Sequence, residues 1–229
     1  MPAAVDSDIR LASPRSALER WAALGGVLYV ILFVVGTILL VGDEPSGDAS
    51  PGEVVRFYSD SGHRDRITLG WALVGLGLFF FLWFLVALRQ ALIRLVGEGF
   101  LPTLATVGGA VYAALALAGI AVNMAIKTMS DDTYRHQVYP PLIHAANDAG
   151  YVLHSTGGVG IGTLMIAASL AVVRTRVLPV WLGWGGVAAG ILALASIVFF
   201  PWFLIALWLL VASGILFAAG SSTRAPATT

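Results

Sequence analysis

Long apolar runs constrain this chain more than any other feature of its sequence. A helix that crosses the hydrocarbon core of a bilayer, about 30 Å thick, needs about 20 mostly apolar residues. Runs of that length occupy residues 21–41, 68–88, 104–126 and 151–173. Of the 229 residues, 58% are hydrophobic and 11% are charged, and the mean hydropathy is +0.87. The pattern predicts an all-α membrane protein rather than a soluble globular domain.

A fifth apolar run covers residues 180–217 and is too long for a single crossing. As one straight helix it would measure about 57 Å, nearly twice the hydrocarbon thickness. Pro201, in the segment "FFPWF", has no backbone N–H to donate, and it disfavours helical geometry at Phe200. The run therefore predicts a hairpin of two helices, which brings the total to six transmembrane helices.

The positions of the basic residues predict the orientation. Eight arginines flank the spans on one side, whereas five basic residues are spread over two longer loops on the other side. Short basic loops favour the cytoplasm, so we expect both termini inside and residues 42–66 and 127–150 outside the plasma membrane. The first span is longer than the apolar region of a signal peptide, and we expect it to be retained. This organisation gives cytoplasmic tails at 1–19 and 221–229 around a six-helix domain at 20–220.

Charge and cysteine content narrow the classes of partner and chemistry. Thirteen basic and thirteen acidic residues cancel, so the chain has no overall field to recruit nucleic acid, and the lipid bilayer is its expected partner. The absence of cysteine excludes disulfides, thiolate metal sites and cysteine nucleophiles. The oligomeric state is left open by the sequence.

The first outer loop contains a predicted helix. In "SPGEVVRFYSD", Ser50 is followed by Pro51 and by Glu53 three residues later, the spacing of a capping box. The apolar residues that follow give this short amphipathic helix one apolar side, which is expected to lie on the membrane surface or against the bundle. A structural lid is the simplest role for such a helix.

Two arginines precede the second span in the segment "GHRDRI". Arg64 and Arg66 carry guanidinium groups that match the geometry of carboxylate and phosphate, so they are candidates to bind an anionic headgroup or solute. The alternative is that both residues are solvated anchors at a helix end.

The segment "HAANDAGYVLHST", residues 144–156, places many polar residues at the start of an apolar helix. Pro140 and Pro141 set the start of a helix there, which runs outside the membrane before it enters the bilayer. Spacings of four, three and four residues place a polar stripe on one face of this helix, which we expect to face the bundle interior or a water-filled cavity. The stripe consists of His144, Asp148, Tyr151 and Ser155, with Asn147 and His154 on its flank.

Two interpretations of the stripe stay open. In the first, His144, Asp148 and His154 hold a metal ion, with His136 as another source of an imidazole ligand. In the second, the helix mouth is held by hydrogen bonds and ion pairs. No cofactor is predicted under the second interpretation.

In that second interpretation, Asp148 pairs with Lys127, Arg64 or Arg66. Asn123 and Lys127 lie one turn apart near the outer end of the third span, at a depth where they would line the same vestibule. Otherwise Lys127 extends to the interface and Asn123 makes an interhelical hydrogen bond.

The middle of every span lacks Asp, Glu, Lys and Arg, the residues that proton relays and midplane transport sites use. Two small-residue pairs, Gly158 with Gly162 and Gly186 with Gly190, predict close helix packing instead. Our leading hypothesis is a non-catalytic membrane protein that binds a lipid headgroup, small solute or partner protein at its outer mouth. The alternatives are a metal-dependent membrane hydrolase and a channel or transporter subunit.

Three segments carry a resemblance to known sequences. They are "SPGEVVRFYSDSGHRDRI", "FFLWFLVALRQAL" and "LPVWLGWGGVAAG". In them the chain resembles uncharacterised multi-pass membrane proteins of actinomycetes, similar to families described only as domains of unknown function. The resemblance covers Trp21 to Ala219 and implies six helices in a bacterial plasma membrane. It implies no activity, ligand or catalytic residue.

Overall fold

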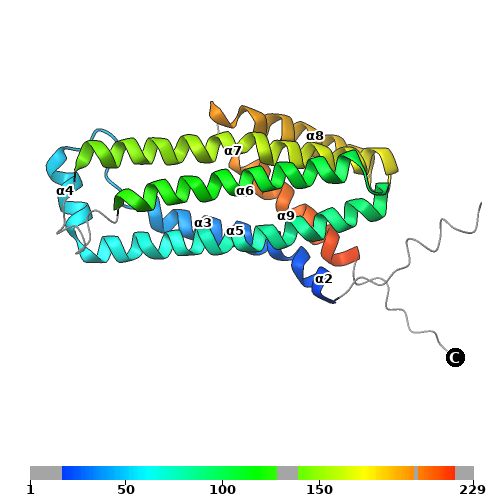
Figure 1. The fold of residues 1–229 in the computed structure, drawn as a ribbon, viewed down its shortest axis with the longest axis horizontal. Coiled ribbons are helices and arrows are strands. Elements are labelled where there is room, and N and C mark those ends of the chain that lie inside the picture. Colours follow the sequence, from blue (N-terminus) through cyan, green and yellow to red (C-terminus); the bar gives the residue numbers. More distant parts are fainter. Residues whose placement is uncertain (1–16, 128–138, 199–200, 220–229) are drawn as a thin grey trace, which may run out of the picture.

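The computed structural model of the chain describes residues 17–127, 139–198 and 201–219. Within these ranges every regular element is a helix, and there is no strand. The longer helices lie side by side along one axis and form an elongated bundle (Figure 1). The predicted all-α architecture is confirmed for this part of the chain.

Five helical segments are long and apolar enough to cross a membrane, which makes the chain a multi-pass integral membrane protein. They are α2 with α3 (Ala17–Ala23 and Gly25–Val41), α5 (Ser61–Val96), α6 (Phe100–Lys127), α7 (Pro140–Thr175) and α9 (Trp202–Ala219). Helices α5 and α7 have 36 residues each. At about 54 Å they are longer than the bilayer core is thick, so both extend beyond the predicted spans.

The predicted hairpin at residues 180–217 is found, but its first arm is short. Helix α8 (Val180–Leu194) has 15 residues and continues into the 3₁₀ turn η3 (Ala195–Ile197). Helix α9 begins directly after Pro201, whose carbonyl accepts a hydrogen bond of 3.0 Å from the N–H of Leu204. At about 22 Å, α8 alone falls short of the hydrocarbon thickness, so five of the six predicted spans are confirmed by length and composition.

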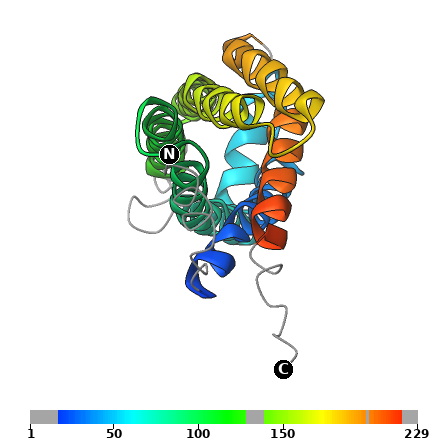
Figure 2. The ribbon, with the colours of Figure 1, turned by 90° about the vertical axis from the view of Figure 1, so that its right-hand side faces the viewer.

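Glycines allow the helices to approach one another closely. A Cβ atom on Gly162 of α7 would lie 2.7 Å from the carbonyl oxygen of Gly190 on α8. A Cβ on Gly108 of α6 would lie 2.6 Å from the carbonyl oxygen of Gly160 on α7. Side chains at these positions would push the helices apart, which confirms the predicted packing role of the small-residue pairs. Helix α8 packs on α7 at the periphery of the bundle (Figure 2).

The two ends of the bundle differ. One end, which we call the α4 end, carries the short helix α4 (Pro51–Ser59) and the starts of α5 and α7 (Figure 1). The opposite end carries the loops between α5 and α6 and between α7 and α8. A large cluster of buried apolar side chains fills the bundle. A smaller cluster joins Val54, Phe57 and Tyr58 of α4 to side chains of the neighbouring helices.

Candidate functional site

Helix α4 is built as the sequence predicts. The Ser50 side chain accepts a hydrogen bond from the N–H of Glu53, and the Glu53 carboxylate accepts one of 2.8 Å from the N–H of Ser50. This reciprocal capping box starts the helix, and Pro51 occupies its first turn. Val54, Phe57 and Tyr58 turn inward and are buried, so α4 lies against the bundle as a lid.

A carboxylate joins this lid to the rest of the bundle. Tyr58 of α4 donates a hydrogen bond from its hydroxyl to Glu44 in the preceding loop. Asn147 of α7 donates a second one, of 2.9 Å, to the same carboxylate oxygen. Burial and then the negative charge of Glu44 raise the pKa of Tyr58 above its ordinary value of 10.0, so its hydroxyl keeps the proton that it donates. The loop before α4, α4 itself and the distant helix α7 therefore meet at Glu44.

The two candidate arginines of α5 have different surroundings. Arg64 donates hydrogen bonds of 3.2 Å and 2.7 Å to the carbonyl oxygens of Tyr58 and Ser59, at the end of α4. It therefore satisfies backbone acceptors that the helix end leaves open. Arg66 pairs through Nη1 with Asp43, and this hydrogen bond and charge hold the pKa of Asp43 below its ordinary value of 3.8.

Arg66 has donors to spare. Its Nε and Nη2 atoms are buried and have no hydrogen-bond partner in the described part of the chain. These two nitrogens form the edge of the guanidinium that binds two oxygens of a carboxylate or phosphate at once. A buried donor without an acceptor costs about 1–3 kcal/mol, so an anion that reaches this edge would relieve that cost.

His154 lies deeper, among aromatic rings. It stacks on Phe33 with 5.4 Å between ring centroids and meets the edge of Tyr112 at 5.8 Å. The hydroxyls of Tyr112 and Tyr29 are hydrogen-bonded to each other in the core, and Trp202 packs against Phe33 at 4.1 Å. The predicted inward position of His154 is found, and its ring partners Phe33 and Tyr112 come from α3 and α6.

The predicted inward stripe on α7 is wrong at Asp148 and Tyr151. Asp148 is exposed and Tyr151 is 55% exposed, whereas Ser155 is buried and His144 is half-buried. The face of α7 that packs on α6, marked by Gly157 and Gly160, is rotated from the stripe by nearly half a turn. The stripe lies instead on the face that α8 and η3 cover from Gly158 onward, where a Cβ on Gly158 would lie 2.4 Å from the Cβ of Ser196. Because η3 ends the covering arm there, Asp148 and Tyr151 stay uncovered.

Asn123 is buried but does not reach across to a vestibule. Its amide donates a hydrogen bond of 3.1 Å to the carbonyl of Gly119, one turn earlier on the same helix, and its side chain packs on Gly150 of α7. This is an intrahelical bond rather than the predicted interhelical one. Lys127 is the last residue of α6, and its side chain lies outside the described part of the structure.

The three residues that the metal interpretation requires are not brought together. His144 and His154 are ten residues apart on one helix, about 15 Å along its axis, and they point in directions about 80° apart. His154 stacks in the aromatic cluster, while Asp148 is on the exposed face. The described residues contain no group of three histidine, aspartate or glutamate side chains placed to hold an ion. His136 lies outside the described residues.

Glu44 and Tyr58 were not among the predicted site residues, and Asn147 was placed only on the flank of the stripe. A signal for Tyr58 was available, because a phenol on the buried side of a helix needs an acceptor for its hydroxyl. The same reasoning applies to Tyr29 and Tyr112, which interrupt apolar helices. The sequence gives no indication of which acceptor each phenol meets.

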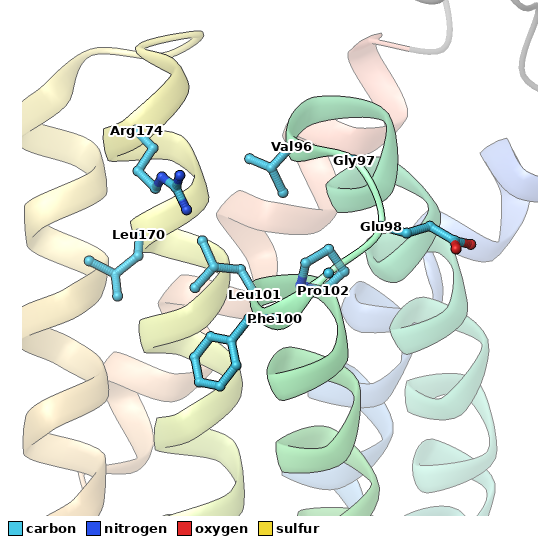
Figure 3. Close-up of a pocket in the computed structure, with 9 residues that line it drawn as sticks. Val96, Gly97, Glu98, Phe100, Leu101, Pro102, Leu170 and Arg174 are labelled. Atoms are coloured by element: carbon cyan, nitrogen blue, oxygen red, sulfur yellow. The ribbon is translucent and has the colours of Figure 1, made fainter.

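The opposite end contains a small pocket of about 390 Å³ beside the loop between α5 and α6. Figure 3 shows Arg174 of α7 pointing toward Val96 and Leu101, while Glu98 points away. The pocket lining is mostly apolar. Arg174 is itself exposed, so this pocket lacks the buried polar groups that mark the α4 end.

Comparison with known proteins gives a family without an activity. No curated protein and no solved structure matched the chain. One family model, described as a domain of unknown function, DUF4386, matches residues 24–223. This range runs from the start of α3 to beyond the end of α9 and thus includes the lid, Glu44 and the aromatic cluster. The chain belongs to the DUF4386 family of proteins.

Proposed function

We propose that this integral membrane protein is a non-catalytic lipid-binding protein whose α4 end binds the anionic headgroup of a phospholipid. The main support is the guanidinium group of Arg66. Its Nε and Nη2 atoms are buried without a hydrogen-bond partner in the described part of the chain, while Nη1 pairs with Asp43. Arg66 lies in the second turn of α5, close to the start of the apolar run, which is the depth of lipid headgroups. The exposed fraction of the whole side chain is 27%, so Arg66 lies at the surface of the bundle although Nε and Nη2 themselves are covered.

The proposal includes the topology. Helix α8 and η3 together measure about 28 Å, close to the bilayer core, which supports α8 as a sixth crossing. With six crossings both termini lie on one side, and the distribution of arginines favours the cytoplasm of a bacterial cell for that side. The α4 end then faces outward from the plasma membrane.

Neither alternative function gains support from the geometry. A metal-dependent hydrolase needs a ligand set that converges on one point, and His144, Asp148 and His154 diverge. A channel or transporter subunit would use ionisable groups near the midplane, and the spans have none in their middle. Solute flux in liposomes is the direct test of that second alternative.

The decisive experiment measures phospholipid binding to the full chain. Native mass spectrometry of purified protein titrated with phosphatidylglycerol should give an affinity that Arg66→Gln weakens by about 10- to 100-fold, the equivalent of about 1.5–3 kcal/mol for charged hydrogen bonds. Arg56→Gln is the matched control, since Arg56 is an exposed arginine of α4 at the same end, and it should keep the affinity. An equal loss of affinity in both variants would mean that net charge, and not the position of Arg66, controls binding.

A further pair of measurements separates headgroup binding from fold support. Asp43→Asn removes the anion that competes for Arg66, so binding should be retained or strengthened although the ion pair is lost. Glycerol phosphate, which carries the phosphate without acyl chains, should compete only weakly if the ligand is a lipid. If wild-type protein shows no preference for phosphatidylglycerol over phosphatidylcholine, the proposal is wrong.

A further inference from the structure

A second feature lies toward the opposite end of the bundle, in the membrane-embedded wall. An open groove of about 820 Å³ separates α8 from α9, and its floor is formed by α5 and α7. Helix α8 packs mainly on α7 and touches α9 much less. In Figure 2, α8 lies against α7 at the edge of the bundle. The volume lies within the range of small-molecule binding sites, about 300–1,000 Å³.

Gly185 of α8 lines the groove and contributes to its open space. A Cβ on Gly185 would meet no atom within 4 Å, so the missing side chain leaves open space. The nearby polar groups are satisfied by each other, since the indole N–H of Trp208 donates a hydrogen bond of 3.3 Å to the hydroxyl of Ser169. The remaining lining is almost entirely hydrocarbon, which suits an apolar occupant.

One end of the groove is charged. Arg94 of α5 is the single charged residue among the described residues that line it. Its Nη1 donates a hydrogen bond of 2.9 Å to Glu19, while its Nε is buried without a hydrogen-bond partner. The α9 wall runs from Leu204 to Ala219, about 22 Å, which exceeds the roughly 15 Å depth of hydrocarbon in one leaflet.

We propose that this groove is a binding site for one phospholipid, with an acyl chain between α8 and α9 and the phosphate at Arg94. The groove matches the chain in polarity and length, and the arginine at its end matches the phosphate in charge. The chain beyond residue 220 is a poor occupant, because SSTRAPATT contains no large apolar side chain. The site is independent of Arg66, which lies at the α4 end.

The test is native mass spectrometry of the full chain titrated with palmitoyl lysophosphatidylglycerol, a single-chain lipid. Gly185→Leu adds a side chain at a groove-lining position where the Cβ meets no atom within 4 Å, and it should weaken binding by about tenfold or more. Gly214→Leu is the matched control, because Gly214 of α9 also has open space around its missing side chain but does not line the groove. It should bind as the wild type does.

Two further measurements test the contribution of the phosphate and provide a second groove-filling variant. Monopalmitoylglycerol, which lacks the phosphate, should bind about tenfold more weakly to the wild type, and Arg94→Gln should abolish that difference. Glu19→Gln keeps Arg94 and should preserve the difference. If Gly185→Leu does not fold, Leu207→Trp fills the groove from the α9 wall, with Leu210→Trp outside the groove as its control.

Equal lipid affinity in Gly185→Leu, Gly214→Leu and wild type would overturn the assignment. The assignment would also be overturned if the wild type were a dimer that Gly185→Leu converts to a monomer with no change in lipid affinity. The groove would then be an interface with a second copy of the chain. Loss of lipid binding in Arg66→Gln but not in Gly185→Leu would leave the proposed headgroup site standing and remove this one.

Discussion

Asn147 of α7 donates a hydrogen bond of 2.9 Å to the carboxylate of Glu44, 103 residues earlier in the chain. Tyr58 of α4 donates to the same oxygen. The single carboxylate thus fixes the lid helix and the protruding start of α7 to one loop. Loss of Glu44 is expected to loosen both.

We first predict that Glu44→Ala lowers the free energy of unfolding by about 1–3 kcal/mol, because two neutral donors lose a charged acceptor. Hydrogen exchange should increase in residues 51–59 more than in the helices of the bundle. Asp65→Asn is the control, since Asp65 is an exposed acid at the same end. Unchanged exchange in α4 would contradict the anchoring role of Glu44.

The capping box predicts a pH dependence. The hydrogen bond from the backbone of Ser50 holds the pKa of Glu53 below its ordinary value of 4.5. Because the folded pKa is lowered, the stabilising contribution is complete above pH 4.5 and is lost as the pH falls through the folded value. Exchange protection of α4 should fall in that acid range, and Glu53→Gln should remove this step.

Ser50→Ala should cost about 1 kcal/mol of local stability at neutral pH, as loss of an N-cap does. Ser59→Ala, at the exposed other end of α4, is its control. A cost confined to local opening of α4, measured by hydrogen exchange, is expected. Equal effects of the two substitutions would argue against the cap.

The glycine contacts predict where the bundle tolerates a methyl group. Gly108→Ala and Gly160→Ala place a Cβ 2.6 Å from a carbonyl oxygen of the facing helix, so each should destabilise the protein by about 1–3 kcal/mol. Gly75→Ala, where a Cβ meets nothing within 4 Å, should be neutral or stabilising by up to about 1 kcal/mol. Thermal unfolding in detergent checks the order of the three variants.

The buried tyrosine pair predicts non-additive substitutions. Tyr29→Phe removes one hydroxyl and leaves the other without that partner in the core, at a cost of about 1–3 kcal/mol. The double variant Tyr29→Phe with Tyr112→Phe should cost less than the sum of the two single variants, because no orphaned hydroxyl remains. Additive effects in thermal unfolding would mean that the two hydroxyls do not depend on each other.

Labelling at introduced cysteines checks the topology. The chain has no cysteine, so a single one can be placed without background. An impermeant maleimide applied to intact cells should label Ser46→Cys at the α4 end and leave Glu98→Cys at the opposite end unlabelled. Val198→Cys, 89% exposed after η3, should be labelled if α8 is a complete crossing. Its protection, together with labelling of Glu98→Cys, would reverse the orientation.

The sequence by itself determined the helical membrane architecture, the helix α4 with its cap, the break at Pro201 and the close packing of glycines. Each of these depends on residues that are neighbours in the chain or on the apolarity of one segment. A capping box spans four successive residues, and a transmembrane span needs about 20 apolar ones, so no long-range information is required.

Only the tertiary structure decided which polar residues meet. The spacing of His144, Asp148, Tyr151 and Ser155 correctly puts them on one face of α7, but spacing does not say which helix covers that face. The short arm α8 covers its inner half, while the interior side of α7 presents Asn147 and His154 to Glu44 and to the aromatic rings. Helix rotation within a bundle is set by packing against neighbours, and those neighbours come from distant parts of the chain.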